Sequence, residues 1–250
     1  RDSSIIDSFT IIRKNNPNGI VIANIGADKT LNAALNTIEI LKADVLQIHI
    51  NQVQEMLMPE GERNFRSWLD NIKEIVAKVN IPVIVKEVGF GMNRRTIKAL
   101  KSLGVNIIDI SGRGGTNFAT IENTRRDIPM PYMENWGLST VESLLEANEV
   151  ADVDILASGG IRNPLDVVKA LALGAKAVGM ASYFLHLING NAIEVAINKF
   201  SAFLNEIKTI MTILGASRIE ELKHTELIFS DSLVNYIIQR NIDYKILISR

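Results

Sequence analysis

The stretch DILASGGIRNPLDVVKALALGAKAVGMAS, residues 154–182, contains a complete strand–helix–strand pattern. An apolar run over residues 154–157 precedes a helix that begins at Asn163-Pro164 and ends before Gly174, and a second apolar run covers residues 177–180. Near-continuous apolar runs are typical of parallel strands that are covered on both faces. The stretch therefore predicts two parallel strands joined by a helix, the repeating unit of an α/β fold.

The same pattern recurs along the chain. Apolar runs predict six strands, over residues 20–25, 45–50, 82–88, 106–110, 154–157 and 177–180. Amphipathic stretches predict helices over residues 31–41, 65–79, 94–102, 140–147, 165–173 and 192–214. This alternation predicts a parallel sheet, either an open doubly wound sheet or a (β/α)8 TIM barrel.

The first predicted element is a helix over residues 3–14, and the six predicted strands are two fewer than a barrel contains. This count fits a barrel with about six of its eight βα units present and its first βαβ segment missing. It also fits an open six-stranded sheet, and composition does not separate the two. No linker or low-complexity segment divides the chain, so residues 1–250 are expected to form a single domain.

Composition narrows the classes of function. The 27 Lys and Arg balance 28 Asp and Glu, for a net charge of −1, which disfavours nucleic acid or an anionic membrane as a partner. Because the sequence has no Cys, disulfides, thiolate metal sites and cysteine nucleophiles are excluded. The apolar stretch over residues 170–188 is interrupted by Gly174, Lys176 and Gly179, so it does not predict a membrane span. A cytoplasmic enzyme is expected.

Polar residues gather where the predicted strands end, which is the functional rim of either architecture. They are Asn24, His49, Asn51, Gln54, Glu55, Lys86, Glu87, Asp109, Ser111 and Thr116. Small residues follow the last two strands, at Ser158-Gly159-Gly160 and Ala181-Ser182. Exposed backbone N–H groups in such loops bind phosphate, and this is the usual phosphate site of barrels. The alternative is that these glycines only make tight turns.

Lys86 lies at the end of an apolar run, where an ammonium group must be paired or functional. It could form a Schiff base, act as a base or contact an electron-rich cofactor, or it could form a salt bridge with Glu87 or Asp109. Glu55, in a dense polar cluster with His49, could hold Mg²⁺. No His and carboxylate set has zinc spacing.

An ordered set of motifs carries a family resemblance. The motifs are residues 47–51, Gln54-Glu55, Pro59-Glu60-Gly61, Val85-Lys86-Glu87-Val88-Gly89, Asp109-Ile110-Ser111-Gly112, Gly114-Gly115-Thr116, Ser158-Gly159-Gly160 and Ala181-Ser182. Together they resemble the type 2 isopentenyl-diphosphate isomerases, from about residue 8 to 222. Each motif alone has little specificity, but the ordered set is specific.

The resemblance implies an FMN-dependent (β/α)8 barrel that interconverts isopentenyl and dimethylallyl diphosphate. It implies a flavin that is reduced by NADPH and acts as acid and base, a requirement for Mg²⁺, and a homo-oligomer, tetramer or octamer. On the matching positions, the FMN contacts would be Asn24, Lys86, Ser111, Thr116, Gly159, Gly160, Ala181 and Ser182. The catalytic group would be Gln54, His49, Asn51 and Glu122, and Glu55 would bind the metal.

Two departures keep alternatives open. The family's N-terminal motifs for diphosphate and flavin have no counterpart in this sequence. FMN-dependent 2-hydroxy-acid oxidases and dehydrogenases resemble the same region, but they place a His base where this chain has Arg113. A non-catalytic flavin-binding barrel is the third possibility. Retention of Gln54, Glu55 and Lys86 together argues against it.

Overall fold

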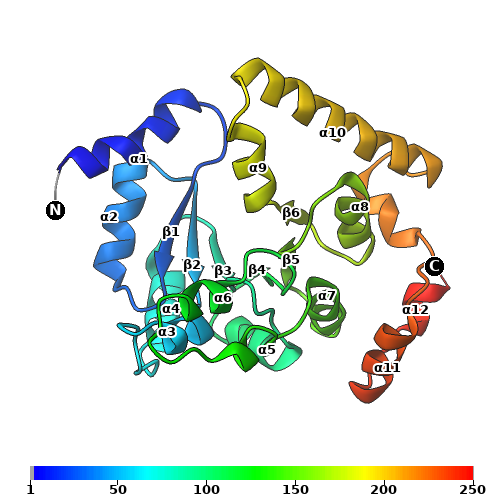
Figure 1. Cartoon of the computed structure of the whole chain (residues 1–250), viewed down its shortest axis with the longest axis horizontal. Helices are drawn as coiled ribbons and strands as arrows, with labels where there is room; N and C mark the ends of the chain where they lie inside the picture. Colours follow the sequence, from blue (N-terminus) through cyan, green and yellow to red (C-terminus); the bar gives the residue numbers. More distant parts are fainter. Residues whose placement is uncertain (1–2, 250) are drawn as a thin grey trace.

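The centre of the molecule is a parallel six-stranded sheet whose strands follow one another in chain order (Figure 1). The computed structural model describes residues 3–249. The strands are β1 (Ile22–Gly26), β2 (Val45–His49), β3 (Val83–Lys86), β4 (Ile107–Asp109), β5 (Asp154–Ser158) and β6 (Ala177–Gly179). All six agree with predicted strands. Because a doubly wound sheet reverses its strand order at a switch point, the sequential order favours the barrel.

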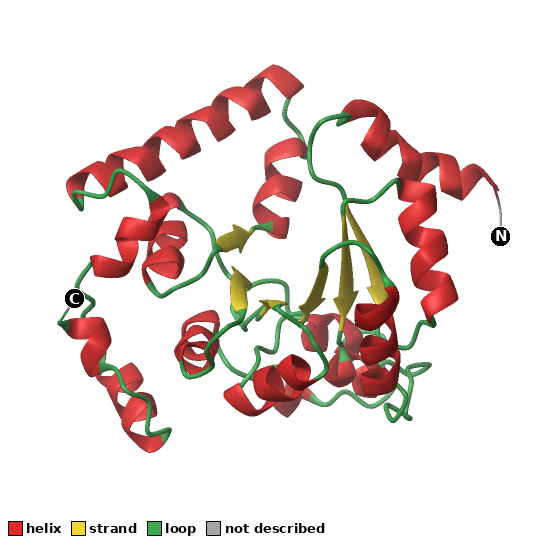
Figure 2. Cartoon of the chain, turned by 180° about the vertical axis from the view of Figure 1, so that it is seen from behind, coloured by secondary structure: helices red, strands yellow, loops and turns green. Residues whose placement is uncertain are grey.

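Helices lie around the outside of this sheet in both views (Figures 1 and 2). Those predicted are α1 (Ser3–Asn15), α2 (Leu31–Leu41), α4 (Trp68–Lys78), α5 (Arg94–Ser102), α7 (Thr140–Asn148), α8 (Pro164–Ala172) and α10 (Ile193–Ile213). Side-chain caps fix several of the starts, since Ser139 forms a capping box with Glu142 and Asn163 accepts from the Asp166 N–H. Only α4 begins clearly later than predicted, at Trp68 instead of residue 65.

Several helices were not predicted. They are α3 (Gln52–Leu57), α6 (Phe118–Asn123), α9 (Ala181–Ile188), α11 (Asp231–Gln239), α12 (Lys245–Ile248) and two 3₁₀ helices, η1 (Pro131–Met133) and η2 (Ile219–His224). The helices α3 and α6 have six residues each, too few for a 3.6-residue periodicity to show. α3 begins three residues after β2 and α6 lies in the segment that follows β4, so both carry polar residues at the carboxyl end of the sheet.

The two outer strands differ from the central ones. The residues Val83, Ile84 and Val85 of β3 are all buried, as predicted for a strand covered on both faces. On β1, in contrast, Ile22 is 46% exposed, and Ala177 and Gly179 of β6 are exposed as well. Within residues 3–249, β1 pairs only with β2, and β6 only with β5. The expectation of cover on both faces is therefore wrong for these two strands.

A buried carboxylate ties the C-terminal helices to the barrel. The side chain of Glu146 on α7 is fully buried and accepts hydrogen bonds from Arg94 on α5 and from Arg240 and Tyr236 at α11. This arrangement agrees with the place of α11 beside α7 in Figure 1.

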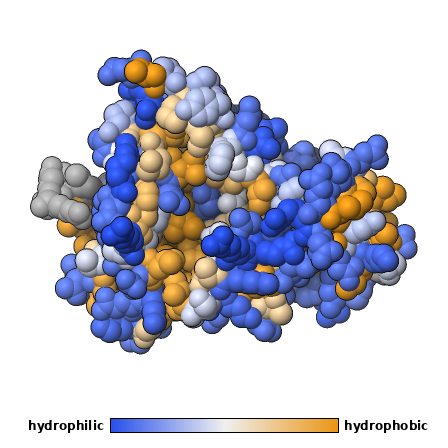
Figure 3. Space-filling model, turned by 90° about the horizontal axis from the view of Figure 1, so that it is seen from below, coloured by the Kyte–Doolittle hydropathy of each residue, from blue (hydrophilic) through white to orange (hydrophobic). Residues whose placement is uncertain are grey.

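The surface is mixed in polarity. Figure 3 shows apolar residues in the middle of one face, bordered by hydrophilic ones. None of the helices in the described part of the chain has both the length and the apolar character needed to cross a membrane.

Candidate functional site

A cavity of about 1050 Å³ lies at the carboxyl ends of the strands. Its walls come from residues at the ends of β1, β2, β3, β5 and β6 and from the segments that follow β2 to β6, including the loop after β4. The volume lies just above the usual range for small-molecule sites, which is roughly 300 to 1,000 Å³. The cavity is therefore large enough for a cofactor and a small substrate together.

All eight residues predicted to contact FMN line this cavity. They are Asn24, Lys86, Ser111, Thr116, Gly159, Gly160, Ala181 and Ser182. Because they come from five strand ends spread over most of the chain, the fold alone brings them together.

Backbone groups form one end of the cavity. Gly159 and Gly160 have φ values of +93° and +75°, which L side chains rarely adopt. A Cβ on Gly159 would lie 2.0 Å from the Gly112 carbonyl oxygen, so this loop packs directly against the loop after β4. Ala181 and Ser182 form the first turn of α9, where N–H groups lack partners within the helix. These donors fit an anion such as a phosphate group.

Arg162 adds a positive charge at the same end. Its guanidinium donates a 2.8 Å hydrogen bond to the Gly114 carbonyl, and the side chain lines the cavity beside Gly160. The sequence reasoning missed this residue, although its position two residues after the glycine pair was the available signal.

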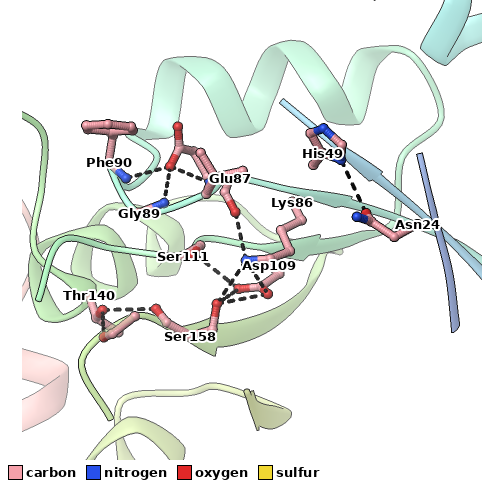
Figure 4. Close-up of polar contacts among 12 residues, drawn as sticks. Asn24, His49, Lys86, Glu87, Gly89, Phe90, Asp109, Ser111, Thr140 and Ser158 are labelled. Atoms are coloured by element: carbon pink, nitrogen blue, oxygen red, sulfur yellow. Dashed lines mark hydrogen bonds and ion pairs between the residues drawn. The ribbon is translucent and has the colours of Figure 1, made fainter. Parts of the chain in front are cut away.

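Lys86 is paired and also lines the cavity (Figure 4). Its Nζ donates to the Glu87 carbonyl at 2.8 Å and to Ser158 Oγ at 3.3 Å, and lies 3.4 Å from Asp109 Oδ2. Of the two carboxylates considered from the sequence, Asp109 is the partner. The side chain remains 25% exposed, so the ammonium is both stabilised and accessible.

The Glu87 carboxylate organises the loop after β3. Its Oε2 accepts the backbone N–H groups of Val88, Gly89 and Phe90 at 2.5 to 2.7 Å. Burial raises the pKa of Glu87 to about 7, although these hydrogen bonds act in the opposite direction. Val88 and Gly89 line the cavity, so this carboxylate shapes the wall from behind.

His49 and Gln54 occupy another part of the wall. The His49 ring nitrogen Nδ1 lies 3.4 Å from Asn24 Oδ1, which joins the ends of β1 and β2. Burial lowers the pKa of His49, which favours the neutral imidazole. Both side chains were predicted to belong to the site.

The other predicted catalytic residues lie next to the cavity but do not line it. Asn51 donates to Gln54 Oε1 at 3.3 Å and to Glu55 Oε1 at 2.9 Å. Gln54 in turn donates to Glu122 Oε1 at 3.1 Å. The four polar residues thus form one hydrogen-bonded network that connects α3 with α6, and Gln54 is its member on the cavity wall.

Arg125 completes this network from beyond α6. Its guanidinium forms an ion pair of 2.8 Å with the buried carboxylate of Glu122, and a second ion pair with Glu60. The sequence reasoning did not find Arg125, because nothing in the local pattern indicates that Glu60 and Glu122 share one cation.

Glu55 is the residue predicted from the sequence to bind a metal ion. Its second oxygen, Oε2, accepts the Glu62 N–H at 2.8 Å. Residues 3–249 contain no group of three or more His, Cys, Asp or Glu side chains that could hold a metal ion. A single carboxylate still suits Mg²⁺, which is commonly bound through one or two carboxylates together with substrate phosphates.

Two residues from α9 and α10 also line the cavity. They are His186, which was given no role from the sequence, and Lys199. His186 Nδ1 lies 2.7 Å from the Ser182 carbonyl oxygen, and Lys199 donates to Asn191. His186 was missed because α9 was not predicted as a helix. Lys199 lies on α10, which was predicted, but its place at the cavity depends on how α10 packs.

Solved structures similar to this one contain related folds. A mandelate oxidase variant with 2-hydroxy-phenylacetamide matches 86% of this chain and 64% of that chain, with a TM-score of 0.59 and 13% identity. A flavocytochrome b2 variant with pyruvate bound matches 87% and 59%, with a TM-score of 0.61 and 20% identity. This chain therefore spans less than two thirds of either protein. At these identities the likeness shows the fold, and it agrees with the (β/α)8 barrel.

Sequence comparisons are more specific. Residues 42–229 match the family model of the FMN-dependent dehydrogenases. An isopentenyl-diphosphate delta-isomerase of Staphylococcus saprophyticus is 49% identical over 98% of this chain and 71% of its own length. One from Staphylococcus aureus (strain Newman) is 46% identical over 97% of this chain and 70% of its own length. The chain therefore belongs to the FMN-dependent, type 2 isopentenyl-diphosphate delta-isomerases.

Proposed function

We propose that this protein interconverts isopentenyl and dimethylallyl diphosphate, using reduced FMN and Mg²⁺. One observation carries the proposal: the eight expected flavin contacts, together with His49 and Gln54, line a single cavity. The relatives that carry the isomerase name match nearly the whole chain. The reaction adds a proton at one end of a three-carbon unit and removes another proton from the far end, without net redox change.

The residues of the cavity fit FMN by their chemistry. The loops at Gly159-Gly160 and Ala181-Ser182, with Arg162 nearby, would hold the phosphate. Lys86 would lie against the electron-rich ring, with Asn24, Ser111 and Thr116 as further contacts. When bound and reduced, the flavin would supply the acid and base for the alkene.

The chain's own residues would bind and orient the substrate on the α3 side. Glu55 would hold Mg²⁺ against the diphosphate oxygens, where a hard cation offsets their charge. Gln54 would contact the substrate from the cavity wall, with His49 and Asn51 completing that side. Glu122 would assist proton transfer as a carboxylate, and its hydrogen bond from Gln54 would orient that amide.

The proposal includes NADPH as the reductant, a homo-oligomer of four or eight chains, and a cytoplasmic location. It also includes a single FMN-binding barrel domain, in which further βα units would pair with the free edges of β1 and β6. One continuous apolar core, which extends from α2 through the sheet to α11, supports the single domain. A single cooperative unfolding transition would support the single domain, and the mass measured by light scattering tests the number of chains in the oligomer.

Oxidation of a 2-hydroxy acid is the alternative reaction. Arg113 stands where those enzymes have a His base, and its side chain is exposed. Removing a proton from a hydroxy acid would then lack a general base at this position. Lactate or glycolate oxidation by the unmodified protein, with no isomerase activity, would favour this alternative.

Deuterium incorporation from heavy water into isopentenyl diphosphate tests the proposed reaction directly. The complete mixture contains FMN, Mg²⁺ and NADPH, and each is then left out in turn. Label that appears only with reduced flavin and Mg²⁺ supports the isomerase. Absence of exchange in a protein that binds reducible FMN would refute the proposed reaction. The metal role of Glu55 is tested separately, since Glu55→Gln is expected to raise the Mg²⁺ concentration needed for exchange.

A further inference from the structure

The ammonium group of Lys86 forms a hydrogen bond with Ser158 and an ion pair with Asp109, and both partners are buried (Figure 4). Ser158 Oγ lies 2.8 Å and 3.0 Å from the two Asp109 carboxylate oxygens, and it accepts from Lys86 Nζ. A serine hydroxyl has one proton, so donation to Asp109 leaves its lone pairs for the lysine. The three side chains therefore form one directed chain, from ammonium to hydroxyl to carboxylate.

Asp109 is the buried end of this chain. It is 8% exposed and does not line the cavity, whereas Lys86 and Ser158 do. Parallel pairing places Asp109 beside Lys86 in the β3–β4 register. The carboxylate thus stands behind the lysine and balances its charge from the protein side.

The same carboxylate holds a second cavity residue. Asp109 Oδ1 accepts the Ser111 N–H at 3.1 Å. Ser111 has a φ of +26°, an uncommon conformation for a residue other than glycine, and such strain persists only where the surroundings fix it. Asp109 therefore connects to two of the residues expected to contact FMN.

We propose that Asp109, together with Ser158, is a positioning residue that fixes Lys86 and Ser111 at the cavity and offsets part of the positive charge presented to FMN. This inference rests on the flavin component of the proposed function. A reduced, ionised flavin carries more negative charge than the oxidised form, so a less compensated ammonium would bind it more tightly. Asp109 then lowers the reduction potential of the bound flavin.

Asp109→Asn tests this role, because it keeps the shape and removes the charge. Spectroelectrochemical titration of the FMN-loaded protein measures the midpoint potential. We expect the reduced flavin to gain about tenfold in affinity relative to the oxidised form, a positive shift of about 30 mV. Asp154→Asn is the matched control, since Asp154 is exposed at the other end of the adjacent strand β5. It is expected to leave the potential unchanged.

Ser158→Ala provides a second variant that retains the carboxylate. It should weaken the binding of oxidised and reduced FMN by a similar factor, about threefold to tenfold, the usual range for the loss of one hydrogen bond, with little change in potential. The inference is overturned if Asp109→Asn binds FMN and keeps the wild-type potential, or if Asp154→Asn shifts it equally. It is also overturned if Asp109→Asn does not fold and Ser158→Ala binds FMN like the wild type. Wild-type protein that binds no FMN would instead refute the flavin assignment.

Discussion

The Gln54 side-chain amide on α3 donates a 3.1 Å hydrogen bond to the Glu122 carboxylate on α6, across 68 positions of sequence. Glu122 is 3% exposed, and its other oxygen is paired with Arg125. Gln54 is thus fixed from behind while its side chain lines the cavity. The orientation of an amide on the cavity wall therefore depends on a carboxylate that does not itself reach the cavity.

Glu122→Gln should lower turnover and leave FMN binding unchanged. Glutamine still accepts the hydrogen bond from Gln54, but it cannot carry a proton as a carboxylate does. If Glu122 assists proton transfer, kcat falls about 100-fold in the deuterium-exchange assay. Glu60→Gln is the control, because it removes the other partner of Arg125 at an exposed position. Equal losses in both variants would show that Glu122 acts only by holding Arg125.

Glu87 should make the stability of the protein depend on pH. Burial raises its pKa to about 7 from 4.5, so the folded state binds this proton more tightly than the unfolded chain does. The stabilisation is complete below about pH 4.5, declines as pH rises through 7, and is lost above it. Glu87→Gln retains an oxygen for the three N–H groups and cannot ionise. Its Tm should therefore fall less than that of the wild type between pH 5 and pH 8, and equal falls would contradict this account.

Glu146 should protect the protein against acid. Burial opposes its ionisation, but hydrogen bonds from Arg240 and Arg94 outweigh burial and lower the pKa of Glu146 to about 2. The stabilisation of the folded state by ionised Glu146 is present at neutral pH and is lost as pH falls from about 4.5 to 2. Glu146→Gln removes the buried carboxylate that Arg94 and Arg240 share and should cost about 3 kcal/mol in urea unfolding at pH 7.

Glu149→Gln is the matched control for that experiment. Glu149 follows the same helix, lies 3.5 Å from Arg94 and is partly exposed, so its loss should cost under about 1 kcal/mol. Similar costs for the two variants would mean that burial of the Glu146 pair is unimportant.

Gly159→Ala should abolish FMN binding. A Cβ at this position would meet the Gly112 carbonyl at 2.0 Å, and the φ of +93° is strained for alanine. Gly215→Ala is the control for a strained backbone outside the cavity, because Gly215 has a φ of +72° but no atom within 4 Å of its Cβ position. Fluorescence titration with FMN should find wild-type affinity in Gly215→Ala. Wild-type affinity in Gly159→Ala would disprove close packing of the two loops.

Local patterns were sufficient to predict the strands and the residues that follow them. Glycines after apolar runs and a lysine within one are visible in a single segment, and these residues line the cavity. Partners were harder to predict, because they depend on how strands align. Lys86 and Glu87 are neighbours in sequence, yet successive residues of a strand point to opposite faces, and Lys86 pairs with Asp109 instead.

The short helices explain part of the remaining omissions. Six residues in α3 or α6 give little periodic signal, and their mutual contact joins segments far apart in the chain. Arg125, which follows α6, was missed for this reason, whereas Arg162 lies in the loop before α8 and was missed although it directly follows the glycine loop. Each acts through a distant group, Glu60 for Arg125 and the Gly114 carbonyl for Arg162.

The close approach of Gly159 to the Gly112 carbonyl makes this end of the cavity wall less tolerant of substitution than the end formed by α3. At the glycine loops the wall is backbone against backbone, and side-chain replacement can only break it. At α3 the wall is formed by the Gln54 side chain, whose size and polarity can change without moving the backbone. Substitutions that change which small molecules fit the cavity are therefore expected to be tolerated at α3, whereas the glycine loops should tolerate few.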